Sequence, residues 1–254
     1  MDLNIDNIDE NESSFCSLWS RTHQKINCVE LFLNPKLGDD YFFNRLNIKN
    51  SCRNISDILN SIKNSHTNYH DSLYVHLICN NEKNCVKFSI PKFGTMKILG
   101  LDLNKYVLES ESDHIEIDVI DKVHLYSWID VFCRSFDSIH IKDEVTNIIS
   151  KHYQKLTLLV AHHNNLDQVN YFVGCCLLYE KKQSIGLYCL GTIQHFRRKG
   201  VARKLIASAV RIAKKKGHNL LIVQTLTKEG YEEFYKKLGF RTIYEKMLYS
   251  FEMK

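Results

Sequence analysis

Ile193-Gln194-His195-Phe196-Arg197-Arg198-Lys199-Gly200-Val201-Ala202 is the most informative segment of this 254-residue chain. A strand-like apolar segment precedes it, and apolar residues follow it at every fourth position, namely Val201, Leu205, Ala209 and Ala213. The order strand, basic turn, helix places cations at a helix N-terminus, where backbone N–H groups lack partners and the dipole favours negative charge. Gly200 and Ala202 lack bulk, so the backbone can approach an anion closely. The stretch therefore predicts a diphosphate-binding turn.

The spacing of this turn differs from that of other phosphate loops, because neither G-x-x-x-x-G-K-[ST] nor G-x-G-x-x-G is present. Nine Lys or Arg residues and no Asp or Glu lie between Arg197 and Lys216. The front part, Arg197 to Ala202, fits a diphosphate, whereas the rear part from Arg211 is typical of a solvated helix face. Few aromatic residues are interleaved with these charges, which disfavours nucleic acid as the partner.

Hydrophobic periodicity gives the element order of the C-terminal half. Helices are predicted over 123–136 and 143–153, and strands over 156–162, 171–180 and 184–193. These are followed by a helix from Gly200 to Gly217, a strand over 220–226, a short helix over 229–238, and closing strands over 240–244 and 247–251. Three meander strands and a crossover helix predict an α/β (α+β) domain, with a mixed, mostly antiparallel sheet flanked by helices.

The N-terminal half predicts a smaller α/β domain. Its expected helices cover 14–24 and 55–62, and its expected strands cover 30–33, 73–79, 86–90 and 96–101. A turn is expected at 35–38, and the first dozen residues are expected to be a loose tail. We place the domain boundary between residues 118 and 119, which gives domains 1–118 and 119–254.

Composition points to an ordinary globular protein, with 44% hydrophobic and 25% charged residues. No apolar run approaches the roughly 20 residues that a membrane span requires, and the acidic N-terminus does not resemble a secretory signal. The nine cysteines include no C-x-x-C pair, so the sequence predicts reduced thiols, with neither a disulfide framework nor a metal site. A cytoplasmic location is therefore expected.

Two motifs carry a family resemblance. Arg197-x-x-Gly200-x-Ala202 matches the Q/R-x-x-G-x-G/A signature of the GNAT superfamily of acetyl-CoA-dependent N-acetyltransferases, between the expected strand and helix. Phe234-Tyr235-Lys236-Lys237-Leu238-Gly239-Phe240 resembles the F-Y-x-x-L-G-F segment of the same family. Together with the element order, the resemblance covers residues 120–254. It implies the GNAT acyl-CoA N-acyltransferase fold and transfer of an acetyl group from acetyl-CoA to a primary amine.

The resemblance also implies roles for particular residues. Backbone groups of Leu190, Gly191 and Thr192 would pair with the pantetheine arm, and a backbone N–H there would stabilise the developing oxyanion. The pyrophosphate would lie on the turn formed by Arg197, Arg198, Lys199, Gly200, Val201, Ala202 and Arg203. Tyr235 matches the tyrosine that protonates the departing CoA thiolate, and Tyr188 is a candidate base. The amine would attack the thioester directly in a ternary complex, and no metal is implied.

Some positions depart from the family pattern. Gln194 stands where a proline often follows the strand, and Thr227-Lys228-Glu229-Gly230 lacks the usual Asn, which puts Lys228 as a CoA contact in doubt. The base is not identified by the sequence, and water remains an alternative to a side chain. The other candidate bases are His162, His163 and His195, and candidates for holding a cationic amine are Asp137, Asp143 and Glu144.

The N-terminal half leaves further alternatives open. Phe93-Gly94 with the strand at 96–101 resembles the closing strands of a degenerate GNAT unit, which suggests a tandem chain with a silent first copy. An unrelated cap domain, or an extension of the substrate cleft, is the other interpretation. For the whole chain, a catalytically silent CoA-binding or regulatory module is the alternative to an enzyme. The sequence identifies neither the acceptor nor the oligomeric state.

Overall fold

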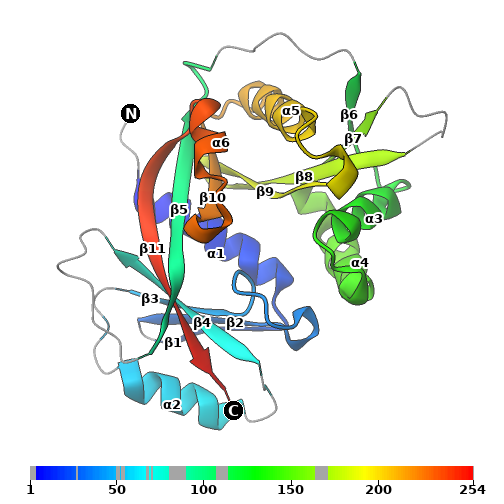
Figure 1. Cartoon of the computed structure of the whole chain (residues 1–254). Helices are drawn as coiled ribbons and strands as arrows, with labels where there is room; N and C mark the ends of the chain where they lie inside the picture. The colour runs from blue at the N-terminus through cyan, green and yellow to red at the C-terminus, as the bar shows by residue number, and fades with distance from the viewer. Residues whose placement is uncertain are drawn as a thin grey trace. The chain divides into compact units, whose positions relative to one another are not determined.

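A computed structural model of the chain describes residues 4–26, 28–49, 52, 55–66, 69, 71–79, 90–106, 114–163 and 171–253 (Figure 1). It consists of two compact units, each built from several segments of the chain. Unit 1 comprises Met1–Glu12, Gly100–Val223 and Lys236–Arg241, and unit 2 comprises Ser13–Leu99, Gln224–Tyr235 and Thr242–Lys254. This division differs from a single cut between residues 118 and 119, because the end of the chain pairs with a strand of the N-terminal half.

The sheet of unit 1 has the strand order β10-β9-β8-β7-β6. Its strands are β6 (Ile115–Val119), β7 (Leu156–His163), β8 (Phe172–Lys181), β9 (Ser184–Thr192) and β10 (Leu220–Leu226). The neighbours from β6 to β9 are antiparallel, and β10 is parallel to β9. The predicted meander and the parallel pair that follows the crossover helix are therefore confirmed.

Three helices pack in unit 1, namely α3 (Leu125–Ser135), α4 (Lys142–His152) and α5 (Val201–Lys215). Each matches a predicted helix. In α5 the apolar residues at every fourth position are buried, and their burial keeps the helix on the sheet. Gly217 ends this helix with a φ of +81°, a conformation that favours glycine, and its N–H donates to the carbonyl of Lys214.

Helices α3 and α5 cover opposite faces of the unit 1 sheet. A Cβ atom built onto Gly174 of β8 would meet Val201 and Leu205 of α5, whereas one built onto Gly191 of β9 would meet Ser135 at the end of α3. Gly191 pairs with Cys175, the neighbour of Gly174, and successive strand residues point to opposite faces. The loop after β9 therefore leads from the sheet to the face that α5 covers, which is opposite to the face covered by α3.

The strands of unit 2 follow the order β1-β2-β3-β4-β11-β5-β10, and β5 and β10 contribute residues to both units. Its strands other than β10 are β1 (Thr22–Ile26), β2 (Val29–Leu33), β3 (Arg45–Ile48), β4 (Ser72–Cys79), β5 (Lys92–Asp102) and β11 (Arg241–Glu252). The pair β3–β4 is parallel, and β1–β2, β2–β3 and β4–β11 are antiparallel. Two helices complete the elements named here, α2 (Ile55–Ser65) and α6 (Glu232–Lys237).

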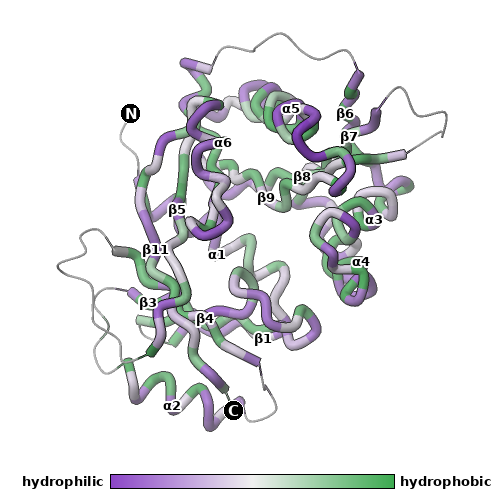
Figure 2. Tube along the Cα trace, viewed as in Figure 1, coloured by the Kyte–Doolittle hydropathy of each residue, from purple (hydrophilic) through white to green (hydrophobic). Residues whose placement is uncertain are grey.

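The core of unit 2 is formed by β2, β3 and β4 together with one face of α2. Ile55, Leu59 and Ile62 of α2 are buried in it, which confirms the helix that their spacing predicts. Hydrophobic and hydrophilic stretches alternate along the tube of α2 in Figure 2, as expected for a helix that buries one side. The predicted strands at 30–33, 73–79 and 96–101 lie within β2, β4 and β5.

Residues 4–12, the described part of the expected tail, are not loose, and the helix predicted at 14–24 is misplaced. Helix α1 runs from Ile5 to Trp19, and strand β1 follows it. Asn4 caps α1, because its side-chain oxygen accepts from the N–H of Asn7 at 3.3 Å. The buried side includes Ile8 and Phe15 but also the polar Asn11, so the hydrophobic pattern alone underestimates it.

Two further predictions need correction or lie outside the described residues. The closing strands expected at 240–244 and 247–251 form one continuous strand, β11, because residues 245–252 pair without interruption with β4. The short strand β3 was not predicted. Of the strand expected at 86–90, residues 86–89 lie outside the described part of the chain.

The expectation that all thiols are reduced is wrong for one pair. The sulfur atoms of Cys28 and Cys52 are joined in a disulfide, whose half-cystines pack in the core of unit 2. The described free thiols are Cys16, Cys133, Cys175 and Cys176, which are buried, and Cys189, which is half-buried. Burial raises the pKa of the Cys175 and Cys176 thiols and disfavours their thiolates. None of the described helices combines the length and the apolar character that crossing a membrane requires.

Candidate active site

The turn between β9 and α5 has the backbone of an anion-binding loop. A short 3-10 helix, Gln194–Phe196, follows β9, and α5 then starts at Val201. Gly200 is the N-cap residue with a φ of +87°, and no side chain caps the helix. Arg198 also has a positive φ, +63°. Alternating left-handed residues before an uncapped helix direct successive N–H groups toward one spot, which is the geometry of a phosphate site.

Arg197 holds this turn in place. Its Nε donates to the carbonyl of Thr192 at 3.1 Å, and its Nη2 donates to the carbonyl of Ser135 at 3.1 Å. One guanidinium thus joins the end of β9 to the end of α3. Arg198 is exposed, and Lys199 is exposed with its ammonium 5.1 Å from the ring centroid of Phe196. The structure therefore gives Arg197 a positioning contact and leaves Arg198 and Lys199 on the surface of the turn.

Glycine in β8 determines how closely α5 approaches the sheet. A Cβ atom on Gly174 would lie 2.5 Å from Cγ1 of Val201 and 3.0 Å from the carbonyl oxygen of Gly191. Those distances are shorter than van der Waals contact, so only glycine permits the first turn of α5 to lie here. Sequence reasoning missed Gly174, although a glycine inside an apolar strand is a known signal of close backbone approach.

Strand β9 contains a bulge two residues before Gly191. Leu177 pairs with Tyr188 and Cys175 pairs with Gly191, so Cys189 and Leu190 together oppose the single residue Cys176. Cys189 has a φ of +54°. A bulge of this kind redirects the backbone groups of its strand, and bulges are frequent beside active sites.

The ladder between β9 and β10 is short. Leu221 pairs with Ile185 and Ile222 pairs with Gly186, whereas β9 itself continues to Thr192. Leu190, Gly191 and Thr192 lie in the part of β9 beyond this ladder. Their position agrees with the splayed strand that the family resemblance implies, and their contact with a pantetheine arm stays a prediction.

Tyr188 lies inside unit 1. It is 5% exposed, and its hydroxyl donates to the side-chain oxygen of Asn11 at 2.7 Å. The Asn11 amide in turn donates to the carbonyls of Tyr179 at 3.2 Å and Ser184 at 3.0 Å. The structure thus shows Tyr188 and α1 bracing the β8–β9 hairpin, and the role of Tyr188 as a base stays a prediction. Sequence reasoning missed Asn11, because a buried amide has no local signature.

Tyr235 belongs to unit 2, whereas the turn belongs to unit 1. It lies in α6, is buried, and its ring centroid is 5.2 Å from that of Phe234. The ammonium of Lys228 lies 3.3 Å from the ring centroid of Phe93, and Thr227 donates to the carbonyl of Thr95 at 2.8 Å. The structure therefore shows Lys228 on an aromatic ring of its own unit, and the acid role of Tyr235 stays a prediction.

The remaining titratable candidates are scattered over unit 1. His162 contacts Glu116 at 3.2 Å, the ring centroid of His163 lies 5.9 Å from that of Phe196, and His195 is exposed. Of the carboxylates considered for a cationic amine, Asp137 and Asp143 are exposed and Glu144 is buried. No group of His, Cys, Asp and Glu side chains suited to a metal ion occurs among the described residues.

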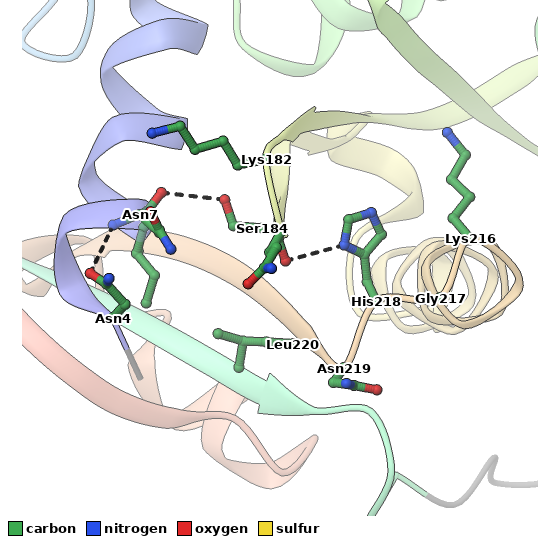
Figure 3. Close-up of a pocket in the computed structure, with 11 residues that line it drawn as sticks. Asn4, Asn7, Lys182, Ser184, Lys216, Gly217, His218, Asn219 and Leu220 are labelled. Atoms are coloured by element: carbon green, nitrogen blue, oxygen red, sulfur yellow. Dashed lines mark hydrogen bonds between the residues drawn. The ribbon is translucent and has the colours of Figure 1, made fainter. Parts of the chain in front are cut away.

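A polar pocket lies at the other end of α5, away from the turn. It has a volume of about 530 Å³ and is lined within unit 1 by the start of α1, the β8–β9 turn and residues 216–220 (Figure 3). Lys216 and His218 both contact Glu180. Partial burial acts to raise the pKa of Glu180, but these two contacts outweigh it and hold the pKa below its ordinary value. The charge of Lys216, just beyond the end of α5, is thus partly neutralised.

Comparison with known proteins shows which family the turn between β9 and α5 resembles. The family model described as Acetyltransferase (GNAT) domain matches residues 154–242, which include β9, the turn and α5. A search of curated proteins finds no match for the sequence.

Solved structures give a likeness over nearly the whole chain. A GCN5-related N-acetyltransferase from Kribbella flavida has a TM-score of 0.69 at 11% identity, over 96% of this chain and 95% of that one. A functionally unknown conserved protein from Staphylococcus epidermidis has a TM-score of 0.67 at 16% identity, over 90% and 92%. A tandem GNAT protein from the clavulanic acid biosynthesis pathway has a TM-score of 0.58 at 8% identity, over 98% and 96%.

At these identities the likeness to solved structures shows the fold alone. The matched family model adds the domain to which the turn belongs, and its range includes both β9 and α5. Residues 154–242 therefore match a GNAT acetyltransferase domain, and the fold of the chain is that of GNAT structures.

Proposed function

We propose that this protein is an N-acetyltransferase that transfers the acetyl group of acetyl-CoA to a primary amine. One observation carries the proposal. The turn between β9 and α5, within the range matched by the GNAT model, contains the left-handed residues Arg198 and Gly200 and ends at the uncapped N-terminus of α5. Phosphate groups are typical ligands of such a turn.

The turn would bind the pyrophosphate through backbone amides of Arg198 to Ala202, and Arg203 extends this row. Two structural features support that fit. Gly174 leaves room for the first turn of α5, and Arg197 holds the turn to the ends of β9 and α3. Because Arg198 and Lys199 are exposed on the turn, their charges would screen the two phosphates.

The end of β9 would position the pantetheine arm. Backbone groups of Leu190, Gly191 and Thr192 lie beyond the ladder with β10, and the bulge at Cys189 precedes them. An extended amide-bearing chain can pair with such a strand edge. A backbone N–H from the same segment would then stabilise the thioester oxygen as it becomes negative.

The chemistry needs few side chains. Acetyl-CoA supplies an acetyl group already activated as a thioester. The neutral amine forms the new C–N bond, the C–S bond breaks, and the thiolate takes up a proton, for which Tyr235 is the proposed donor. The amine loses a proton to a base, for which Tyr188 and water are the candidates carried over from the sequence.

For unit 2, we infer a second GNAT-like copy without a cofactor site. The likeness to a tandem GNAT protein over 98% of this chain supports this inference. No second R-x-x-G-x-G/A segment occurs in the N-terminal half. We therefore propose a small domain at 1–118 and a GNAT domain at 119–254. Strand β11, at the end of the chain, pairs with β4 of the N-terminal half.

Calorimetric titration with CoA tests the binding step. We expect saturable binding to the wild type and binding about fivefold to tenfold weaker in Arg198→Asn, because Asn tolerates a positive φ and only the charge is lost. Lys215→Ala removes a cation from the rear of the same helix and should bind CoA normally. The absence of CoA binding at millimolar concentration would overturn the proposal.

Replacing Tyr235 by Phe separates an enzyme from a silent CoA-binding module. An enzyme that uses this hydroxyl should lose about a hundredfold or more in turnover while keeping its affinity for CoA. Thiol release measured with acetyl-CoA and a panel of amines reports turnover. If the wild type binds CoA but releases no more thiol than an enzyme-free control, the silent module is the better description.

A further inference from the structure

The polar pocket at the rear of α5 plays no part in the proposed acetyl transfer. Three segments of unit 1 line it, namely the start of α1, the β8–β9 turn and the residues that follow α5. Its volume of about 530 Å³ falls within the range of small-molecule sites. The 15 residues of α5 rise about 1.5 Å each, so the pocket and the proposed pyrophosphate turn lie about 22 Å apart, at opposite ends of the helix. The pocket is therefore a separate candidate site.

The lining of this pocket is polar and favours negative charge in a ligand. Four side-chain amides, two ammonium groups, one imidazole and one hydroxyl line it, together with the aliphatic Ile8 and Leu220. Among the described residues of the lining, none is Asp or Glu. A hollow whose charged side chains are all basic attracts anions.

Two lysines supply the positive charge. Figure 3 shows Lys182 and Lys216 on opposite sides of the pocket, with His218 between them. Lys182 pairs with Glu10 and Lys216 pairs with Glu180, and each of these four side chains is more than a third exposed. Exposed ion pairs contribute little to stability, and an ammonium group has three donors. A carboxylate that enters the pocket is therefore able to share both cations at small cost.

His218 joins two walls of the pocket. Its Nε2 lies 3.1 Å from Oε2 of Glu180, and its Nδ1 lies 3.3 Å from the carbonyl oxygen of Gln183. Both partners only accept hydrogen bonds, so the ring donates to both when it is protonated, which adds a third cation to the lining. The backbone N–H of His218 donates to the carbonyl of Ala213, which fixes the residue to the end of α5.

The β8–β9 turn has a backbone conformation that its sequence does not favour. Lys182 is the first of two loop residues and has a φ of +52°, a value for which this position in a hairpin usually has glycine. Such conformations in residues with side chains gather at functional sites. Ser184, just after the loop, donates from Oγ to the carbonyl of Asn7 at 3.3 Å, which ties the turn to α1. The pocket is thus formed before any ligand binds.

We propose that this pocket binds a small organic anion with two or more carboxylate groups. The carboxylates would lie between Lys182 and Lys216, and the polar remainder would face the amides of Asn7 and Gln183. The proposal is independent of acetyl transfer, since it uses none of the residues assigned to CoA. A bound anion would link α1, the β8–β9 turn and the end of α5, and it would stabilise the folded protein in proportion to its concentration.

Citrate is the probe, with acetate and glucose as monocarboxylate and neutral polar comparisons. Calorimetric titration of the whole chain at constant ionic strength should show saturable citrate binding, at least about tenfold tighter than acetate binding, and no glucose binding. Lys182→Asn, which tolerates the positive φ, and Lys216→Gln should each weaken citrate binding about fivefold. Lys215→Gln is the matched control, because this lysine is exposed on the last turn of α5 and lies outside the lining. It should bind citrate as the wild type does.

The pyrophosphate turn also attracts anions, so the citrate titration is repeated with saturating CoA and in Arg198→Asn. Citrate affinity should stay within about twofold in both cases. No saturable citrate binding, equal affinity for acetate, displacement of citrate by CoA, or the same loss in Lys215→Gln as in Lys216→Gln would overturn the inference. Failure of the proposed function has a different signature, because a chain that binds citrate but not CoA retains this site and lacks the other.

Discussion

Gly174 and Val201 are in contact at a point where no side chain fits between them. A Cβ atom on Gly174 would lie 2.5 Å from Cγ1 of Val201, so strand β8 directly supports the first turn of α5. The helix N-terminus that we assign to the pyrophosphate is thus positioned by a glycine on another strand. This relationship links the packing of the sheet to the proposed binding of CoA.

Replacing Gly174 by Ala should displace α5. We expect CoA to bind at least about tenfold more weakly and the free energy of unfolding to fall by about 1–3 kcal/mol, because overpacking shifts the backbone. Calorimetry with CoA and thermal unfolding measure the two effects. Gly94→Ala is the control, since its Cβ would meet only the flexible Leu226 side chain at 3.1 Å. An unchanged CoA affinity in Gly174→Ala would show that this contact does not position the turn.

Arg197 should act through geometry more than through charge. Arg197→Lys keeps the cation, but a single ammonium cannot reproduce the bonds to both Thr192 and Ser135. We therefore expect Arg197→Lys to weaken CoA binding nearly as much as Arg197→Ala does. Titrations at low and high salt distinguish the two effects, because charge effects are screened by salt. Full affinity in Arg197→Lys would indicate that only the charge matters.

The elements of unit 1 could be predicted because their signals are local. Helix α5 follows from apolar residues at every fourth position, and Gly217 marks its end. The bulge at Cys189 could not be predicted, because it depends on which residues of β8 oppose β9. Ser135 and Phe136 beside Gly191 were missed for the same reason, since only the packing of α3 on β9 brings them together.

In unit 2, even more of the structure depends on pairing between residues that are far apart in the sequence. Strand β11 is continuous because it pairs with β4, which lies far away in the sequence. Cys28 and Cys52 meet because β2 and β3 pair with Val29 opposite Ile48, and the spacing of the cysteines alone does not indicate this. Turn motifs and periodicity therefore predicted the turn between β9 and α5, whereas long-range pairing determines its surroundings.

His76 should make stability depend on pH. It is buried, its Nε2 faces the carbonyl of Tyr41 at 2.9 Å, and its Nδ1 faces Nη1 of Arg45 at 3.4 Å. Since Arg45 can only donate, Nδ1 must accept, and the ring is neutral with its proton on Nε2. Burial first, then the charges of Arg45 and Lys246, hold the pKa of His76 well below its ordinary value.

Because the folded-state pKa is depressed, the unfolded chain binds a proton at His76 that the folded chain does not. This contribution to stability is complete above about pH 7, and it is lost as pH falls below about 6.5, by up to about 1.4 kcal/mol per pH unit. Urea unfolding at several pH values should show this slope in the wild type and a smaller one in His76→Gln. Equal slopes would contradict the assignment of a neutral, buried His76.

The Cys28–Cys52 disulfide should stabilise unit 2. It closes a loop with a sequence separation of 24, which corresponds to about 3 kcal/mol from the reduced entropy of the unfolded chain. Cys28→Ser should therefore unfold at lower denaturant than the oxidised wild type, and reductant should bring the wild type to the level of the variant. Peptide mass mapping without reduction should detect the crosslinked pair. Cys189→Ser, at a free thiol, should leave this difference unchanged.

The proposed reaction transfers the acetyl group of acetyl-CoA to a primary amine. The most direct measurement follows one reaction with acetyl-CoA and hexylamine and quantifies both the CoA thiol and the N-acetyl amine. We expect equal amounts of the two products, dependence on the amine, and a rate that falls with CoA affinity in Gly174→Ala. The absence of CoA binding would contradict the proposed acetyl transfer. So would amounts of thiol and N-acetyl product that do not exceed those of the enzyme-free reaction, with hexylamine and with every other amine of the panel.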